Sequence, residues 1–390
     1  MKVLYVVEGP APYGSNKSLI DLIDYVRSRG VEPVVVGSRN GPLTEWLRSR
    51  GIPYYALMHR FSIYPRRSTL ARRIFFIPIT LAFRTLNLIA LIRLVGISRK
   101  LKPDIIHTNV GPVAIGSIAA RILRIKHVWH LREYQDLDFG MKFFPSKEAF
   151  KRGLRNSDRV ICVSHSVAAH FGNPKNARVI HNGVADRDAH ALLMPKEKYF
   201  LFAGRLEAAK GIEQVLMAYM EYVTKSPVAL RLMVVGDGKT DYMARLLSLT
   251  KSIPAGGSIQ FLGFRDDVTA LMQRAKALIV ASENEGFGRI TAEAMFSGCL
   301  VIGRNSGGTA EILEADRPQS LGLLFDSHDA LVSRLIEATI MSDGNYVNLV
   351  STAQTRALDA YCVEQYGSQV LDIYGLLTQP PIDHVNEPPQ

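Results

Sequence analysis

Two carboxylates bracket a glycine-rich turn in the second half of the chain. Glu285 precedes the Gly-Phe-Gly turn at 286–288, and Glu293 follows it on an expected helix. The apolar run 277–281 before the turn is typical of a buried parallel strand, so Glu285 is expected at the carboxyl end of that strand. Glycines allow the backbone to approach a ligand closely, and a helix N-terminus favours an anion. A ligand with phosphate in its middle and hydroxyl groups on both sides, a nucleotide-sugar, fits this pattern.

Two cations follow another apolar run in the same half. The run 199–202 is expected to be a strand, and Arg205 and Lys210 lie on the loop after it. Arginine binds a pyrophosphate as a planar fork, and lysine binds it as a point charge. Most cations are simply solvated at the surface. The position at the end of a strand favours a phosphate-binding role here.

These segments resemble the donor motifs of retaining glycosyltransferase family 4, and the resemblance covers nearly the whole chain. It implies an α/β protein with the GT-B fold, in which two Rossmann-like domains with parallel sheets face each other across a cleft. The donor is then expected in the second domain and the acceptor in the first. Arg205 and Lys210 would bind the diphosphate, Glu285 the sugar hydroxyls and Glu293 the ribose. The expected donor-binding residues are Gly14, Arg205, Lys210, Glu285, Gly286, Phe287, Gly288 and Glu293. Phe264 and Arg265 are added because their loop follows another strand of this domain and could contact the nucleobase, with a simple turn as the alternative.

The resemblance also implies residues on the acceptor side. His130 ends an expected strand and matches the active-site histidine of the family, while Arg132 and Glu133 follow it. Asn16 lies beside Gly14 in the first loop, which lacks the double glycine usual in the family. A histidine at a strand end is more often a structural hydrogen-bonding group than a catalyst. That alternative applies to His107 and stays open for His130.

Strands and helices alternate along the whole chain, which indicates parallel sheets covered on both faces. The expected division is an N-terminal domain over 1–184, a linker over 185–198 and a nucleotide-sugar domain over 199–354. A terminal helix over 355–378 is expected to cross back to the first domain. The tail over 379–390 contains four prolines, which predicts disorder.

Positive charge is concentrated in the first half. Residues 1–190 contain 30 Lys and Arg against 13 Asp and Glu, a net charge of +17, whereas residues 191–390 have 17 against 23, a net charge of −6. No acidic residue lies between Trp46 and Pro103. Basic residues among apolar runs are typical of a protein that binds anionic lipids, and no nucleic-acid motif accompanies them. The residues expected to contact the membrane are Arg66, Arg67, Arg72 and Arg73.

The segment after these arginines has a different expectation. Residues 86–101 are predicted to form a buried helix whose arginines are solvated. Pro78, Arg84 and Arg93 interrupt the apolar run, so a membrane-spanning helix is not expected.

No cofactor and no metal are expected. Two Asp-x-Asp patterns occur, at 136–138 and 186–188, but neither follows a clear strand of the nucleotide-binding unit. Arg205, Lys210 and the helix that begins near Arg289 already supply the positive charge that a metal would contribute. The three scattered cysteines show neither a disulfide nor a zinc spacing, which favours a reducing cytosol.

The sequence therefore predicts a retaining, metal-independent hexosyltransferase. Its expected partners are a nucleoside-diphosphate sugar, with a UDP-sugar as the first choice, a glycan or polyprenyl-diphosphate-linked acceptor, and an anionic membrane surface. It is expected in the cytoplasm, on the inner face of the cell membrane. A GT-B nucleotide-sugar epimerase and a non-catalytic lipid- or polyanion-binding protein of the same fold remain alternatives.

Overall fold

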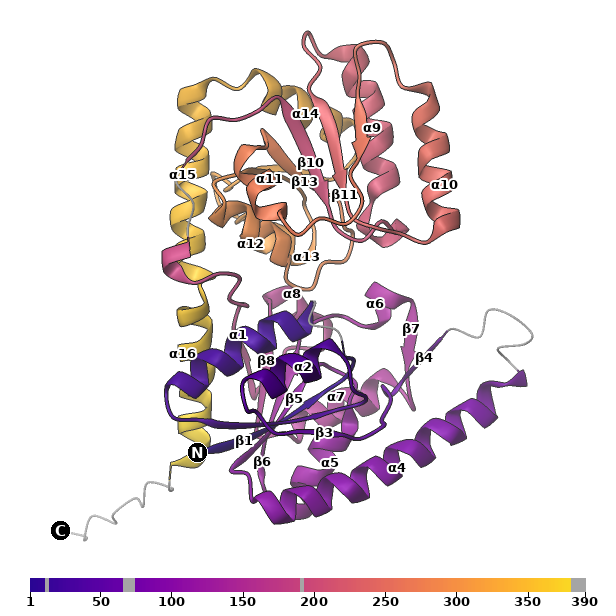
Figure 1. Ribbon diagram of the computed structural model, residues 1–390, viewed down its shortest axis with the longest axis vertical. Coiled ribbons are helices and arrows are strands. Elements are labelled where there is room, and N and C mark those ends of the chain that lie inside the picture. The colour runs from indigo at the N-terminus through magenta and orange to yellow at the C-terminus, as the bar shows by residue number, and fades with distance from the viewer. Residues whose placement is uncertain (11–13, 66–73, 190–192, 380–390) are drawn as a thin grey trace, which may run out of the picture.

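The computed structural model describes residues 1–10, 14–65, 74–189 and 193–379. The chain forms two α/β domains stacked along the long axis of the molecule (Figure 1). Each domain has a parallel sheet between two layers of helices, as the alternating apolar strands predicted. The expected fold class is confirmed.

The N-terminal sheet has seven parallel strands in the order β3-β2-β1-β5-β6-β8-β9. Its central strands are buried because helices cover both faces. Strand β1 is accordingly apolar from Val3 to Val7, whereas β5 ends in the buried polar residues 107–109. The order changes direction between β1 and β5, where a doubly wound sheet opens a crevice at its carboxyl edge. The strands are β1 (Lys2–Val7), β2 (Glu32–Gly37), β3 (Tyr54–Ala56), β5 (Ile105–Asn109), β6 (Lys126–Leu131), β8 (Arg159–Cys162) and β9 (Ala177–Val179).

Seven helices and a small two-stranded sheet complete this domain among the described residues. The antiparallel strands β4 (Ile63–Pro65) and β7 (Met141–Phe143) pair beside the main sheet, and the sequence did not predict them. The helices are α1 (Ser15–Ser28), α2 (Pro42–Ser49), α4 (Phe76–Leu101), α5 (Ala114–Leu123), α6 (Asp136–Phe139), α7 (Lys147–Arg155) and α8 (His165–His170), of which α6 is a single turn.

The C-terminal sheet has six parallel strands in the order β12-β11-β10-β13-β14-β15. Its switch point lies between β10 and β13, the two strands that precede Arg205 and Glu285. The strands are β10 (Tyr199–Ala203), β11 (Arg231–Val235), β12 (Ile259–Phe261), β13 (Ala277–Val280), β14 (Leu300–Arg304) and β15 (Leu323–Phe325). The helices are α9 (Ile212–Lys225), α10 (Thr240–Leu249), α11 (Val268–Arg274), α12 (Arg289–Phe296), α13 (Gly307–Ile312) and α14 (His328–Ile340).

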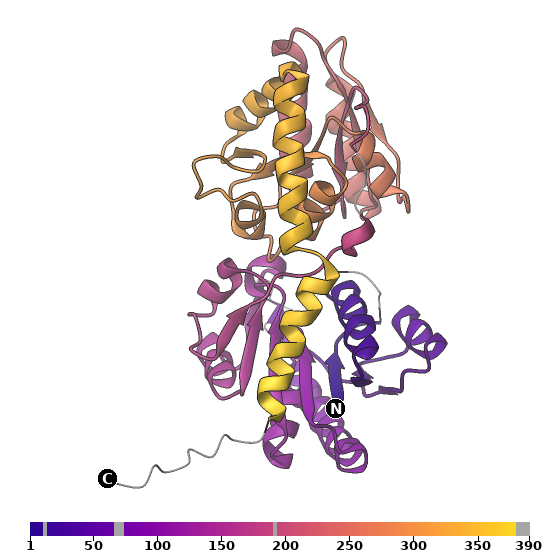
Figure 2. The same ribbon diagram turned by 90° about the vertical axis from the view of Figure 1, so that its left-hand side faces the viewer.

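The C-terminal segment differs from the expected single helix over 355–378. It forms two helices, α15 (Asp343–Ala360) and α16 (Val363–Thr378), and residue 354 falls inside α15. Helix α15 packs on α12 of the second domain, whereas α16 packs on α1 of the first, as Figure 2 shows. The break occurs at Tyr361 and Cys362, whose side chains are buried at the domain boundary. The sequence therefore predicted the return crossing but not the change of helix.

Helix α4 also departs from its expectation. It begins ten residues before the predicted start at 86, at Phe76, and only four of its side chains are buried. The expectation of a buried helix over 86–101 is wrong, because Leu88, Ile89 and Ile92 are exposed. It is the one described helix that is long and apolar enough to cross a membrane by length and composition.

Candidate functional site

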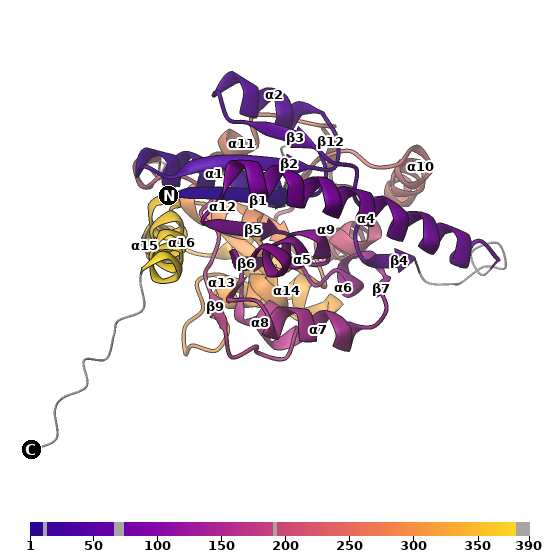
Figure 3. The same ribbon diagram turned by 90° about the horizontal axis from the view of Figure 1, so that it is seen from below.

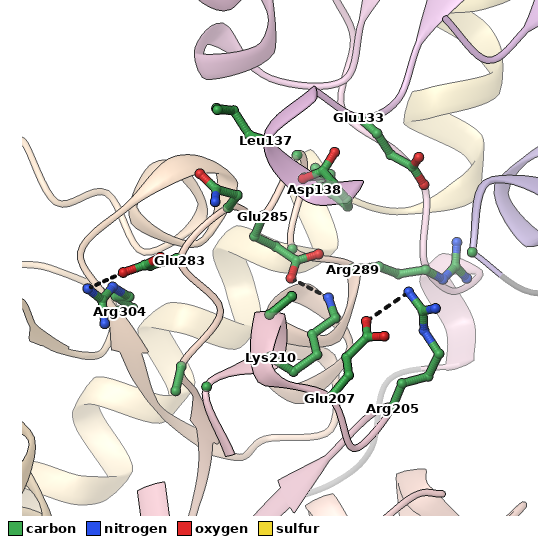
Figure 4. A pocket seen from close by; sticks show the side chains of 18 of the residues that line it. Glu133, Leu137, Asp138, Arg205, Glu207, Lys210, Glu283, Glu285, Arg289 and Arg304 are labelled. Carbon is green, nitrogen blue, oxygen red and sulfur yellow. Dashed lines mark hydrogen bonds and ion pairs between the residues drawn. The ribbon is translucent and has the colours of Figure 1, made fainter. Parts of the chain in front are cut away.

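A cleft with a volume of about 710 Å³ lies between the two domains, at the carboxyl ends of both sheets. The first domain contributes the loop after β1 and the segment after β6. The second contributes the loops after β10 and β13 and the start of α12 (Figure 4). Of the predicted residues, those that line the cleft are Gly14, Arg132, Glu133, Arg205, Lys210, Glu285, Gly286, Phe287 and Gly288.

A lysine–glutamate pair forms the floor of the C-terminal half of the cleft. Lys210 Nζ donates to Glu285 Oε2 at 2.9 Å, which joins the loops after β10 and β13. Figure 4 shows this pair beside Arg205, which forms a 3.2 Å ion pair with Glu207. The Arg205 side chain is 68% exposed, so its guanidinium can turn toward an anion without leaving a buried position. Two cations and two carboxylates thus lie on the loops that follow the neighbouring strands β10 and β13.

The turn between Glu285 and α12 requires glycine at two positions for two different reasons. Gly288 has φ of 90°, a left-handed conformation that glycine adopts without strain, and it begins α12. Gly286 touches the other domain, because a Cβ atom there would lie 2.7 Å from the Arg132 carbonyl oxygen. The Gly286 carbonyl also accepts a hydrogen bond from Ser164 at 2.6 Å. The donor-side turn is therefore held directly against the first domain.

Arg289 connects the domains on the opposite side of this turn. Its guanidinium donates to the hydroxyl of Ser18 and to the carbonyl oxygen of Gly183, both at 3.0 Å, and it pairs with Asp21 at 3.3 Å. It also lines the cleft. Arg289 was not among the predicted site residues. It is the first residue of the helix after the glycine turn, and that position could have indicated that it lies at the cleft.

Glu293 does not line the cleft. Its carboxylate accepts from Arg289 Nε at 2.8 Å and lies 3.5 Å from Lys17 Nζ. In this conformation the Glu293 carboxylate is not free to accept from a ribose as predicted, because Arg289 and Lys17 hold it beside the domain boundary.

Two acidic side chains of the first domain face Glu285. Burial, together with the nearby carboxylates of Asp138 and Glu285, raises the pKa of Glu133 to about 7, although Lys210 and Arg205 act in the opposite direction. Burial also raises the pKa of Asp138 to about 6, although its carboxylate accepts from the backbone N–H groups of Tyr134 and Gln135. The N-terminal wall can therefore carry protons near neutral pH.

A polar network lies behind this wall. Arg132 is almost fully buried, and its guanidinium donates to Asn109 at 2.6 Å and to Tyr366 of α16 at 2.9 Å. His130 is completely buried, with its Nδ1 atom 3.3 Å from His107 and 3.4 Å from Arg132.

The predicted approach of His130 to the transferred sugar is therefore absent in this conformation. Burial, reinforced by the charge of Arg132, holds the pKa of His130 and of His107 well below the ordinary range, so both rings are neutral. His107 hydrogen-bonds Tyr374 of α16 at 2.7 Å, as expected for a structural histidine.

Other predicted residues lie elsewhere. Phe264 is 60% exposed and Arg265 pairs with Asp267 at the surface, and neither lines the cleft. Asn16 is buried beneath the first loop, where its amide donates to the Gly9 carbonyl oxygen at 3.3 Å. The four arginines expected at the membrane, at 66, 67, 72 and 73, lie outside the described residues.

The carboxylates of the Asp-x-Asp pattern at 136–138 already have partners within the protein. Asp136 binds His170 and Lys147, and Asp138 binds backbone N–H groups. Within the described residues, one group has metal-ligand spacing: Glu221, His328 and Asp329, on α9 and α14 outside the cleft.

The fold and the cleft define a two-domain GT-B protein. Two family descriptions match the chain in sequence: Glycosyltransferase Family 4 over residues 12–187, and Glycosyl transferases group 1 over residues 186–354. Together they span both domains up to the middle of α15. The chain belongs to the family 4 glycosyltransferases.

Relatives of known name are distant. The chain is 28% identical over 176 residues to N-acetyl-alpha-D-glucosaminyl L-malate synthase of Bacillus anthracis, covering 42% of this chain and 45% of that protein. It is 27% identical to D-inositol 3-phosphate glycosyltransferase of Rhodococcus opacus, covering 58% of this chain and 54% of that protein. The chain thus spans about half the length of these relatives.

One solved structure shares the fold over almost the whole chain. HepE of Anabaena in complex with UDP and glucose has a TM-score of 0.74 and 21% identity, and the match covers 96% of this chain and 99% of that one. At this identity the similarity concerns the fold.

Proposed function

We propose that this protein transfers a hexose from a nucleoside-diphosphate sugar to a hydroxyl group, with retention at the anomeric carbon and without a metal ion. The observation that carries the proposal is the Lys210–Glu285 pair in the cleft, with Arg205 on one side and the N-terminus of α12 on the other. A solved relative by fold, HepE, binds UDP-glucose, which makes a UDP-sugar the first donor to test.

The chemistry follows from the charges. Negative charge develops on the diphosphate as the sugar leaves. Arg205, Lys210 and the α12 dipole would stabilise it where it forms, a contribution that needs no reorganisation during the reaction. The carboxylate of Glu285 would accept from sugar hydroxyl groups, once Lys210 turns toward phosphate. Retention is consistent with front-face attack, in which the departing diphosphate takes the proton of the acceptor.

The acceptor is proposed to enter from the first domain, past Glu133 and Asp138. The net charge of +17 over residues 1–190 favours an anionic membrane surface and an acceptor linked to a lipid diphosphate, or a glycan, at the cytoplasmic side of the membrane.

A thermal-shift screen with UDP-, GDP-, dTDP- and ADP-sugars, each with and without EDTA, tests donor binding, because a ligand that binds the folded state raises its apparent stability. We expect a shift for one nucleotide that persists in EDTA and disappears in Lys210→Met. Lys225→Met is the control, since Lys225 pairs with Glu221 on α9, outside the cleft.

Product analysis separates the alternatives. An epimerase converts the donor without an acceptor and yields an isomeric nucleotide-sugar, and a binding protein leaves it intact. Retaining transfer is supported if the donor is cleaved slowly in water and faster with an acceptor. The NMR spectrum of the transfer product should then show the same anomeric configuration as the donor. Inverted product would overturn the retaining mechanism alone.

A further inference from the structure

Helix α4 presents an apolar face to solvent along most of its length. Side chains on this face are among the most exposed apolar groups of the protein: Ile77 is 75% exposed, and Leu81 and Ile92 are each 64% exposed. Soluble domains rarely expose contiguous apolar surface of this extent without a partner. The outer face of α4 is defined here as Ile77, Leu81, Leu88 and Ile92.

The spacing of the outer face follows the turns of the helix. Its members are separated by four or seven residues, which places them in one stripe at 3.6 residues per turn. At that same period Arg84, four residues before Leu88, lies at the edge of the stripe, and Arg93 lies about 100° around the helix from Ile92. An apolar stripe bordered by cations is the pattern of a helix that lies in a membrane interface, where acyl chains meet anionic headgroups.

The opposite face of α4 is packed against the domain. Ala90 and Leu94 belong to a hydrophobic core shared with β1, β5 and α5. Asn87 exchanges two hydrogen bonds with the backbone of Arg60, at 2.8 and 3.1 Å. A helix held in this way cannot cross a bilayer without leaving its core, although its length and composition alone would permit a span. It is placed to lie along a surface.

The surroundings of α4 have the charge that an anionic surface attracts. Every charged residue between Trp46 and Pro103 is basic. The neighbouring helix α5 adds the exposed apolar residues Ile118 and Ile122, with Arg121 beside them. Charge complementarity therefore favours a lipid surface over a second copy of this basic domain, which α4 would have to approach against like charge.

The position of α4 relates this face to the catalytic cleft. Figure 3, seen from below, shows α4 running across the underside of the N-terminal domain, away from the C-terminal domain. Its N-terminal end lies near β4 and β7, and Phe76 contacts Phe144 directly after β7. Strand β7 follows α6, whose Leu137 and Asp138 line the cleft. One short segment therefore links the outer face to the acceptor side.

We propose that α4 is a monotopic membrane helix, which inserts its outer face into the headgroup–acyl boundary of an anionic bilayer and so directs the acceptor side of the cleft toward lipid. This names the element behind the peripheral location proposed above and rests on that proposal for its role. The apolar contact adds to charge attraction, so the binding should resist salt more than a purely electrostatic contact does.

Vesicle flotation of the full chain tests the proposal, with phosphatidylglycerol–phosphatidylcholine vesicles compared with phosphatidylcholine alone, in low and in high salt. Replacing Leu81, Leu88 and Ile92 by Ser should weaken binding to anionic vesicles by about tenfold or more, because three apolar side chains that would enter the bilayer are lost. A matched control replaces Val228, Ile340 and Val347 by Ser, which are equally exposed apolar residues of the other domain.

A second readout detects insertion itself. In Leu88→Trp the indole emission should shift to the blue with anionic vesicles and should be quenched by brominated acyl chains. Unchanged flotation of the α4 triple variant, an unquenched indole, or a dimer in solution that the triple variant dissociates would each overturn the proposal.

The donor site is tested separately. If the nucleotide-dependent thermal shift survives in the α4 variant while flotation is lost, both proposals stand. If the shift is absent in the wild-type protein although the vesicles bind, the proposed catalytic function fails and the membrane helix does not.

Discussion

Arg289 and Glu293 lie one turn apart on α12, and the Nε atom of Arg289 donates to the Glu293 carboxylate at 2.8 Å. This contact orients the guanidinium so that its two terminal nitrogens reach the other domain, at Ser18 and Asp21. Glu293 thus acts on the cleft through Arg289. The two glutamates that look equivalent in the sequence have different partners: Glu285 holds a lysine within the cleft, and Glu293 holds the arginine that joins the domains.

The first prediction concerns this domain contact. Arg289→Met should lower kcat/KM for transfer by about 10²-fold, since small displacements of a catalytic arrangement cost that much. Glu293→Gln should give a smaller loss. Steady-state kinetics measures both, with Arg317→Met as the control, because Arg317 is exposed and pairs within its own segment. Equal kinetics in Arg289→Met and the wild type would show that the contact has no part in the reaction.

The second prediction concerns the cation at the donor loop. Lys210→Met should reduce kcat by about 10²–10³-fold, the usual effect of removing one group that stabilises transition-state charge. It also leaves Glu285 without its 2.9 Å partner. Lys225→Met should retain full activity. A change in KM alone would mean that Lys210 binds the substrate and the transition state equally.

The third prediction concerns pH and stability in the ligand-free protein. The pKa of Glu133 is about 7 in the folded state, above the ordinary value near 4.5. Between these two pH values the unfolded chain releases a proton that the folded protein keeps, so stability falls as the pH rises. Glu133→Gln should remove this loss: its melting temperature should match the wild type near pH 4 and exceed it by a few degrees at pH 8.

Glu148→Gln is the control for this pH series. The Glu148 side chain is 69% exposed on α7, so its replacement should shift the melting temperature equally little at both pH values. A parallel offset of Glu133→Gln at every pH would contradict the assigned titration.

The fourth prediction concerns metals. Transfer should proceed at an unchanged rate in excess EDTA, because Arg205, Lys210 and the N-terminus of α12 supply the positive charge at the diphosphate. An initial-rate assay before and after dialysis against EDTA measures this. Activity that is lost and then restored by Mg²⁺ or Mn²⁺ would show that an ion is required.

The fifth prediction compares two glycines of α16. A Cβ atom at Gly367 would collide with the Tyr25 ring of α1, whereas one at Gly375 would meet no atom within 4 Å. Gly367→Ala should destabilise the protein by about 1–3 kcal/mol through overpacking. Gly375→Ala should stabilise it by about 0.5–1 kcal/mol. Chemical denaturation measures both, and equal effects would contradict close packing of α16 on the first domain.

The sequence predicted the strands well because each one is a short apolar run bounded by polar turns. The apolar run 199–202 lies within β10 (Tyr199–Ala203), and the run 277–281 contains β13 (Ala277–Val280). Helix α4 was misjudged because periodicity reveals an apolar stripe but not what covers it. The same alternation of apolar and basic residues fits a core helix and a membrane-surface helix.

The site was predictable where it consists of strand-end loops. Lys210 and Glu285 meet because parallel strands end at the same edge of the sheet. The roles of Glu293 and His130 depended instead on contacts between the domains and with α16, far apart in the chain. No local sequence pattern predicts that His130 lies behind Arg132 or that Arg289 pairs with Asp21.

The chain passes between the two domains at two described places, and these passages lie side by side. Val184 donates to the Tyr361 carbonyl and Val363 to the Ala185 carbonyl, each at 2.9 Å. The paired passages form a narrow two-stranded joint at one edge of the interface, where Gly183 packs against Val363. Rotation of one domain against the other must turn about this joint or break it. Bending at this joint would widen the cleft at the edge far from it. The paired segments would keep the two domains of the glycosyltransferase aligned during that motion.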